Sequence, residues 1–158
     1  MKTVNIYTDG SCMGNPGPGG WGFVVVEDDV VITSSGGGEY HTTNKRMEMQ
    51  ALYKSLKSVY ETFEEDYGGV HVVVNTDCSY VSDAFNKGWL IKWQDNGWKN
   101  SEGQEVSNKD LWRKLLNYQP ILSFQVNRIA RNSSIFNIHA DKIARSKAKE
   151  FKKEASLF

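Results

Sequence analysis

The stretch T-D-G-S-C-M-G-N-P-G-P-G-G, residues 8–20, contains five glycines and two prolines and joins two segments with strand patterns. The preceding segment, V-N-I-Y-T-D, alternates apolar and polar residues and predicts a β-strand that ends at Asp9. The following segment, W-G-F-V-V-V, predicts a second strand. Because glycine and proline favour turn conformations, we expect the stretch to be a turn that joins the two strands.

The same glycines include a G-x-G-x-x-G match at residues 17–22, the spacing found in dinucleotide-binding loops. In that motif the loop leads into a helix, whose N-terminal N–H groups hold the pyrophosphate. Here the glycines lead into a strand, and no G-K-[ST] follows them. The glycines therefore predict a turn and not a phosphate site, which leaves the carboxylate of Asp9 without an explanation.

Strand and helix patterns continue along the rest of the chain. V-V-I-T-S-S, residues 30–35, predicts a third strand, so that the first three strands form an antiparallel meander. An apolar stripe in residues 44–63 predicts a long helix, and the apolar run of residues 70–77 predicts a buried strand. The other expected elements are helices at 80–85, 108–118 and 137–153 and a strand at 121–129.

A meander followed by strands that alternate with helices predicts an α/β fold with a five-stranded mixed sheet. Three strands form the antiparallel meander, two later strands are parallel, and helices flank the sheet. At 158 residues the chain has the size of one domain, and we expect a single domain over residues 1–158.

Composition and charge exclude several classes of protein. The formal net charge is zero, which argues against a protein that simply coats nucleic acid. No apolar run is long enough to span a bilayer, the N-terminus lacks a secretory pattern, and two cysteines are too few for a disulfide framework. These features predict a cytoplasmic protein without a membrane partner. Basic residues crowd the predicted C-terminal helix, and a solvated helix face is enough to explain such a run.

Four carboxylates fall where side chains from different elements can meet. Asp9 and Asp77 each end a predicted strand, and the ends of neighbouring strands lie side by side in such a sheet. Two like charges this close need a cation, and oxygen ligands favour a hard ion such as Mg²⁺. Glu48 and Asp141 lie early in two predicted helices, on the faces that carry apolar residues. The alternative for each residue alone is a turn-former or an acid favoured by the helix dipole.

Six motifs follow one another over almost the whole chain: T-D-G-S-C-M-G-N-P-G-P-G-G-W-G, T-T-N-K-R-M-E-M-Q-A, T-D-C-S-Y-V, G-W-L-I-K-W-Q-D-N-G-W-K-N, N-K-D-L-W and N-I-H-A-D-K-I-A. Together they resemble type 1 ribonuclease H, the bacterial form. The resemblance implies the ribonuclease H-like fold and an endonuclease that cuts the RNA strand of an RNA–DNA hybrid, leaving 5′-phosphate and 3′-hydroxyl ends. It also implies two Mg²⁺ ions, for which Mn²⁺ can substitute, held by Asp9, Glu48, Asp77 and Asp141, with Asp9 bridging both ions.

The resemblance also assigns residues to the RNA strand. Cys12, Asn15 and Asn44 match positions that read the 2′-hydroxyl in the minor groove. Ser79 stands where the family has a glutamine that helps in this task, and its shorter side chain weakens the expectation of a contact.

Two regions are expected to meet the DNA strand. By resemblance, the family's pocket for a DNA phosphate corresponds to Thr43, Arg46 and Asn108. The segment of residues 88–107 resembles the family's basic protrusion, where Trp89 and Trp93 offer stacking surfaces beside lysines. The alternative for these two tryptophans, which are one helical turn apart, is packing in the core.

The largest departure from the family is in residues 127–136, before the last helix. Many bacterial members carry a histidine there that helps move a proton or release product, and this segment has none. His139 precedes Asp141 by two residues on a predicted helix, so it points away from that carboxylate and we interpret it as a surface residue. We therefore expect activity with an altered rate or pH response.

Two other functions share these residues. A non-catalytic hybrid-binding protein would need a broken acidic site, whereas all four acids are present. A related nuclease of the same fold would act on DNA. We expect a monomer whose partner is an RNA–DNA hybrid, with no obligate protein partner.

Overall fold

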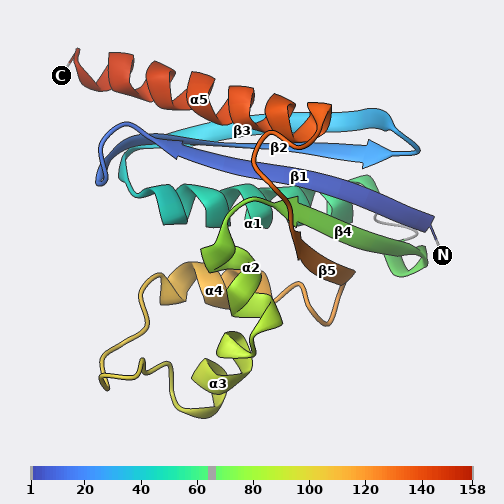
Figure 1. Cartoon of the computed structure of the whole chain (residues 1–158), viewed down its shortest axis with the longest axis vertical. Coiled ribbons are helices and arrows are strands. Elements are labelled where there is room, and N and C mark those ends of the chain that lie inside the picture. The colour runs from blue at the N-terminus through green and yellow to red at the C-terminus, as the bar shows by residue number, and fades with distance from the viewer. Residues whose placement is uncertain (1, 64–66, 158) are drawn as a thin grey trace.

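The computed structural model describes residues 2–63 and 67–157, which form a sheet flanked by helices (Figure 1). The strands are β1 (Lys2–Cys12), β2 (Gly17–Glu27), β3 (Val30–Thr42), β4 (Val70–Thr76) and β5 (Ser123–Arg128). The α-helices are α1 (Asn44–Thr62), α2 (Ser79–Asn86), α3 (Trp89–Asp95), α4 (Lys109–Leu116) and α5 (Ile135–Ala155), and a 3-10 helix covers Tyr67–Gly69. None of the described helices has the length and apolar character needed to cross a membrane.

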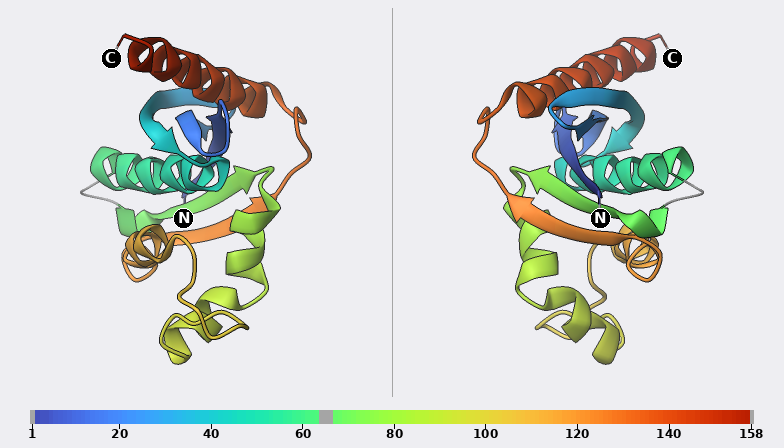
Figure 2. Two further views of the ribbon diagram at one scale, coloured as in Figure 1. Left: turned by 90° about the vertical axis from the view of Figure 1, so that its left-hand side faces the viewer. Right: turned by 90° about the vertical axis from the view of Figure 1, so that its right-hand side faces the viewer.

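The five strands form one mixed sheet in the order β3-β2-β1-β4-β5. β1, β2 and β3 pair antiparallel, while β4 pairs parallel with both β1 and β5. This confirms the predicted meander and the two parallel strands. Helix α5 covers one face of the sheet over β1, β2 and β3, and α1 and α4 lie on the other face (Figure 2).

The apolar stripe predicted for residues 44–63 packs α1 against the sheet. Met47, Leu52, Leu56 and Val59 are all buried, and the alternating valines of β4 meet the same core. Full burial of one such side chain contributes about 1.5–3 kcal/mol. The helix begins at a defined residue because the hydroxyl of Thr43 accepts a hydrogen bond from the backbone N–H of Arg46.

Three strands are longer than the sequence predicts, and β2 begins at Gly17, before the predicted start at Trp21. β1 continues past Asp9 to Cys12, because residues 10–12 still pair with β2 after the parallel partner β4 has ended. β3 continues through three glycines to Thr42. The predicted turn is therefore confined to residues 13–16, where Gly14 has a φ of 91°.

The extra strand residues exist because glycine lets α5 lie directly on the sheet. A Cβ atom at Gly20 would stand 2.5 Å from the backbone nitrogen of Ala148, and one at Gly22 would stand 2.7 Å from Cβ of Ile143. Gly38 faces the ring of Phe151 in the same way. A glycine run typical of a turn thus forms strand here, because close helix packing outweighs its low strand propensity.

The segment of residues 88–107 contains a helix that the sequence analysis did not predict. Helix α3 begins after Gly88, which has a φ of 75°, and ends at Asp95. A single antiparallel bridge joins Lys99 to Glu105 in the remainder of the segment.

Candidate active site

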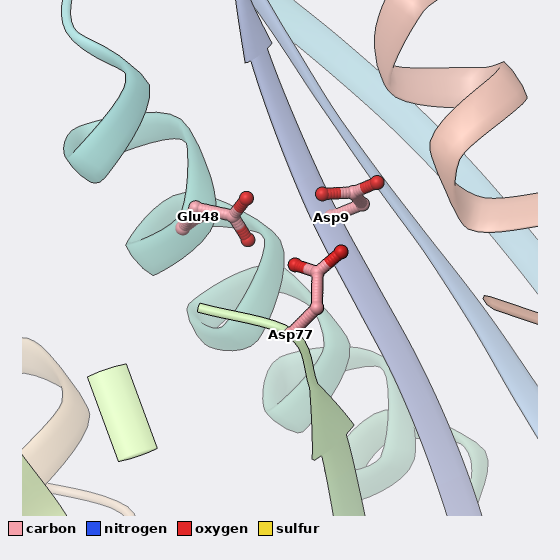
Figure 3. Close-up of side chains that lie close together, drawn as sticks. All are labelled: Asp9, Glu48 and Asp77. Atoms are coloured by element: carbon pink, nitrogen blue, oxygen red, sulfur yellow. The ribbon is translucent and has the colours of Figure 1, made fainter. Parts of the chain in front are cut away.

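Asp9 and Asp77 lie side by side, as predicted from their places at the ends of neighbouring strands. Tyr7 of β1 pairs in register with Asn75 of β4, so Asp9 on β1 and Asp77, directly after the end of β4, each follow two residues later. One carboxylate oxygen from each of Asp9, Glu48 and Asp77 lies within 4.8 Å of the others. Figure 3 shows the three carboxyl groups converging from β1, α1 and the end of β4.

The position of Glu48 depends on close packing between α1 and β1. A Cβ atom at Gly10 would stand 2.5 Å from the backbone nitrogen of Glu48, so only glycine permits this approach. Glu48 is buried, and its Oε2 atom has no hydrogen-bond partner among the described residues. A buried carboxylate oxygen without a partner is costly unless a cation binds it.

Asp141 lies at the edge of this group, in the second turn of α5. Asp9 stands opposite Gly22 of β2 in the sheet, and opposite residues project to the same face, so Asp9 faces α5. Asp141 accepts a hydrogen bond of 3.1 Å from Nε of Arg145, one helical turn later. Its carboxylate helps raise the pKa of both Asp9 and Asp77.

The three clustered acids are held in an environment that disfavours their joint ionisation. Burial, followed by the charge of Asp77, raises the pKa of Asp9 to about 7, although a hydrogen bond with Glu48 lowers it in part. Burial and then the charge of Asp9 raise the pKa of Glu48 well above its usual value. Burial also raises the pKa of Asp77, and the positive charge of Arg131 opposes this shift. The site therefore has the oxygen donors and the charge to bind a hard cation.

The four acids line one open cavity of about 790 Å³. Several other residues that line the cavity were not predicted from the sequence as site residues: Lys45, Tyr80, Arg128, Arg131 and Arg145. The backbone N–H of Ile129 donates to the carbonyl of Thr76 at 2.9 Å, which ties the loop after β5 to the end of β4. Arg128, at the end of β5, and Arg131, in the loop that follows, could have been found from the sequence, since both lie in residues 127–136, where a histidine was expected.

Three of the four residues predicted to meet RNA line the cavity beside the acids, and Asn15 is outside its lining. The three are Cys12, Asn44 and Ser79. The thiol of Cys12 donates weakly to the carbonyl oxygens of Gly17 and Thr42, at 3.5 and 3.4 Å. Asn15 accepts a hydrogen bond of 3.0 Å from the backbone N–H of Asn44, and so ties the turn to the start of α1.

The structure brings Thr43, Arg46 and Asn108 together, but Arg46 also has a partner that the sequence analysis missed. Its guanidinium donates to Oδ1 of Asn108 at 3.2 Å and to both carboxylate oxygens of Asp110 at 3.0 and 2.8 Å. The side chain of Thr43 is engaged in capping α1. Asp110 lies within the quoted motif N-K-D-L-W, where only the asparagine was assigned.

The tryptophans of the 88–107 segment form an aromatic cluster. The ring centroid of Trp93 lies 6.0 Å from those of Trp89 and Trp112 and 6.2 Å from that of Trp98. Trp112 is fully buried, while Trp89 and Trp93 are half-buried and pack against the core. This packing is the alternative that the sequence left open, and it leaves only part of each indole accessible.

His139 is exposed on α5, as predicted. His139 is not among the residues that line the acidic cavity, so its imidazole is outside the candidate site.

Comparison with known proteins places this site in a family. A ribonuclease H family model matches residues 1–149. The chain is 40% identical to a ribonuclease H of Caldicellulosiruptor saccharolyticus, over 96% of this chain and 100% of that protein. It is 39% identical to one of Syntrophomonas wolfei, over 94% and 98% of the two chains.

Solved structures share the fold at lower identity. An N-terminal ribonuclease H domain from Mycobacterium tuberculosis, solved as a fusion protein, superposes with a TM-score of 0.75 at 22% identity, over 98% of this chain and 99% of that one. LC11-RNase H1 in complex with an RNA/DNA hybrid gives a TM-score of 0.73 at 22% identity, over 93% and 97%. The family model and the relatives that match over nearly their full length show that this chain belongs to the ribonuclease H family, as a type 1 enzyme.

Proposed function

We propose that the protein cuts the RNA strand of RNA–DNA hybrids endonucleolytically, leaving 5′-phosphate and 3′-hydroxyl ends. The observation that carries the proposal is the convergence of three carboxylate oxygens within 4.8 Å at one end of the sheet. Membership of the ribonuclease H family supports the reaction, and a structural neighbour, LC11-RNase H1, was solved with an RNA/DNA hybrid.

Four acids are proposed as ligands of two Mg²⁺ ions, for which Mn²⁺ can substitute. When bound, such ions activate an attacking water and stabilise the leaving 3′-oxygen of the phosphodiester. Asp9 would be a ligand shared by the two ions, Glu48 and Asp77 would be ligands of one ion, and Asp141 would be a ligand of the other. Arg145 keeps the carboxylate of Asp141 oriented through their 3.1 Å hydrogen bond.

Recognition of RNA is assigned to the cavity wall next to the acids. Cys12, Asn44 and Ser79 line the cavity beside the acids, and we assign to them the contact with the ribose 2′-hydroxyl, while Asn15 fixes the turn against α1. Ser79 reaches less far than a glutamine, so main-chain groups carry more of this contact.

The DNA strand is assigned to residues outside the lining of the acidic cavity. Arg46, with Asn108 and Thr43 beside it, offers a cation for a DNA phosphate, and Asp110 holds its guanidinium in place. The exposed edges of Trp89 and Trp93 and the exposed Lys92 extend this surface into the protrusion of residues 88–107. A single domain, a monomeric state and a cytoplasmic location stay predictions.

The test is incubation of the purified protein with Mg²⁺ and matched hybrid, double-stranded RNA and double-stranded DNA. We expect cleavage only in the RNA strand of the hybrid, and Asp9→Asn should abolish cleavage while hybrid binding remains. Binding without cleavage by the wild-type chain would favour the non-catalytic alternative. Cutting of the DNA duplex would favour a related nuclease instead.

A further inference from the structure

Most charged residues of α5 lie on two sides of the helix, and the exposed Lys142 and Lys153 project to solvent between them. Ala140, Ala144 and Ala148 are buried and mark the side that faces the sheet. Since residues three, four, seven and eleven positions apart share a side of a helix, the residues on either side of this buried line form two separate rows.

One row faces β3 and contains the acids of the helix's second half. Its members are Ile143, Lys147, Glu150 and Glu154. Ile143 faces Gly36 of β3, and Glu154 accepts a hydrogen bond of 2.8 Å from the hydroxyl of Tyr40. Lys147 pairs with Glu150 at 3.2 Å, so the one lysine of this row has an acidic partner within the row.

The opposite row starts in the acidic cavity and is basic. It runs from Asp141 through Arg145 and Lys149 to Lys152, and the first two of these line the cavity. Lys149 and Lys152 are exposed, and neither makes a salt bridge with any residue of the described part of the chain. The three basic residues span about 10 Å along the axis of α5, which corresponds to about three base-pair steps of rise along a duplex axis.

The direction of this row links it to the site. Figure 1 shows the C-terminal half of α5 running toward the end of the sheet where β1 turns into β2. That turn carries Asn15 and is joined to the start of α1. A strand that leaves the cavity past this turn therefore meets the row of Arg145, Lys149 and Lys152, which we call the basic flank.

We infer that the basic flank of α5 binds the sugar-phosphate backbone of the hybrid beyond the catalytic cavity, and so extends the substrate-binding surface along this helix. The inference rests on the proposed function for the identity of the nucleic acid. Unpaired lysines at regular spacing, continuous with a cavity that takes a phosphodiester, are what backbone contacts require.

The experiment compares two double variants that remove the same net charge. Lys149→Gln/Lys152→Gln changes the basic flank, and Lys57→Gln/Lys147→Gln changes an exposed lysine of α1 and the paired lysine of the opposite row. Binding of a fluorescent hybrid is measured by anisotropy in EDTA over a series of salt concentrations. The plot of log K against log salt has a negative slope, and removal of one lysine–phosphate interaction should reduce the magnitude of that slope by about 0.9.

We expect the slope of the flank variant to be less steep than that of the wild type by about 2. The same variant should raise KM for hybrid cleavage and leave kcat unchanged. The control variant should keep the wild-type slope. Equal slopes in the two double variants would overturn the inference. Cleavage by the wild-type chain is scored separately, so failure of the proposed reaction is distinguishable from failure of the basic flank.

Discussion

Gly10 of β1 and Glu48 of α1 are in main-chain contact, because a Cβ atom at Gly10 would stand only 2.5 Å from the backbone nitrogen of Glu48. The lack of a side chain at one residue thus sets how closely α1 approaches the sheet. It also sets where the Glu48 carboxylate meets Asp9.

Gly10→Ala should therefore destabilise the protein and weaken the acidic site together. The added methyl group has no space, so overpacking should lower the free energy of unfolding by about 1–3 kcal/mol. The shift of Glu48 should also reduce Mg²⁺-dependent cleavage. Urea unfolding and a hybrid cleavage assay measure the two effects. Gly68→Ala is the matched control, because a Cβ atom there meets nothing within 4 Å and its stability should be unchanged.

The metal-free protein should lose stability as pH rises from about 4 to about 7. Asp9 has its folded-state pKa raised to about 7, above the unfolded value near 4, so the folded state holds this proton more tightly and rising pH removes the advantage. Asp9→Asn removes the carboxyl group and should stabilise the metal-free protein at pH 8 by about 1–3 kcal/mol. Denaturant unfolding in EDTA at pH 5 and pH 8 measures both. Equal stabilities of wild type and variant at pH 8 would show that burial and the charge of Asp77 do not raise the pKa of Asp9 as described.

Arg131→Gln should move the acidic limb of the pH–rate profile to higher pH. The positive charge of Arg131 lowers the pKa of Asp77 against the effect of burial, so its removal raises that pKa and lets protons compete with metal at higher pH. The check is the pH dependence of cleavage at fixed Mg²⁺, with Arg131→Lys expected to restore much of the wild-type profile. Arg113→Gln, an exposed arginine outside the acidic cavity, should leave the profile in place.

Trp93→Ala should cost about 2–4 kcal/mol of stability, since Trp93 contacts three other indoles and links α3 to the buried Trp112. Lys92→Gln, the exposed neighbour, should keep the wild-type stability. Thermal unfolding separates the two variants. A stable Trp93→Ala variant that binds hybrid weakly would instead favour a direct stacking role for this indole.

Much of the site could be predicted from the sequence because its acids lie on strongly patterned elements. The valine run before Asp77 and the apolar stripe around Glu48 define the strand and the helix that carry them, and the parallel register then brings Asp77 beside Asp9. No such pattern marks Asp110 or Arg145, whose roles come from partners placed by tertiary packing.

Strand ends were predicted least well where glycine is concentrated. Gly36, Gly37 and Gly38 have the composition of a turn, but they extend β3 because α5 and the indole of Trp21 occupy the space that side chains would take. The helix α3 was missed for a related reason: seven residues give too short a pattern to stand out beside the tryptophans and lysines.

The glycines beneath α5 have one more consequence. Gly20 lets the main chain of α5 lie against β2, since a Cβ atom there would meet the backbone of Ala144 and Ala148. Beside this contact, Val24, Val26 and Ala140 form a small apolar cluster that is separate from the larger core under α1. Substitutions in the larger core should therefore leave the position of Asp141 relative to Asp9 largely unchanged, whereas substitutions in the small cluster should move it.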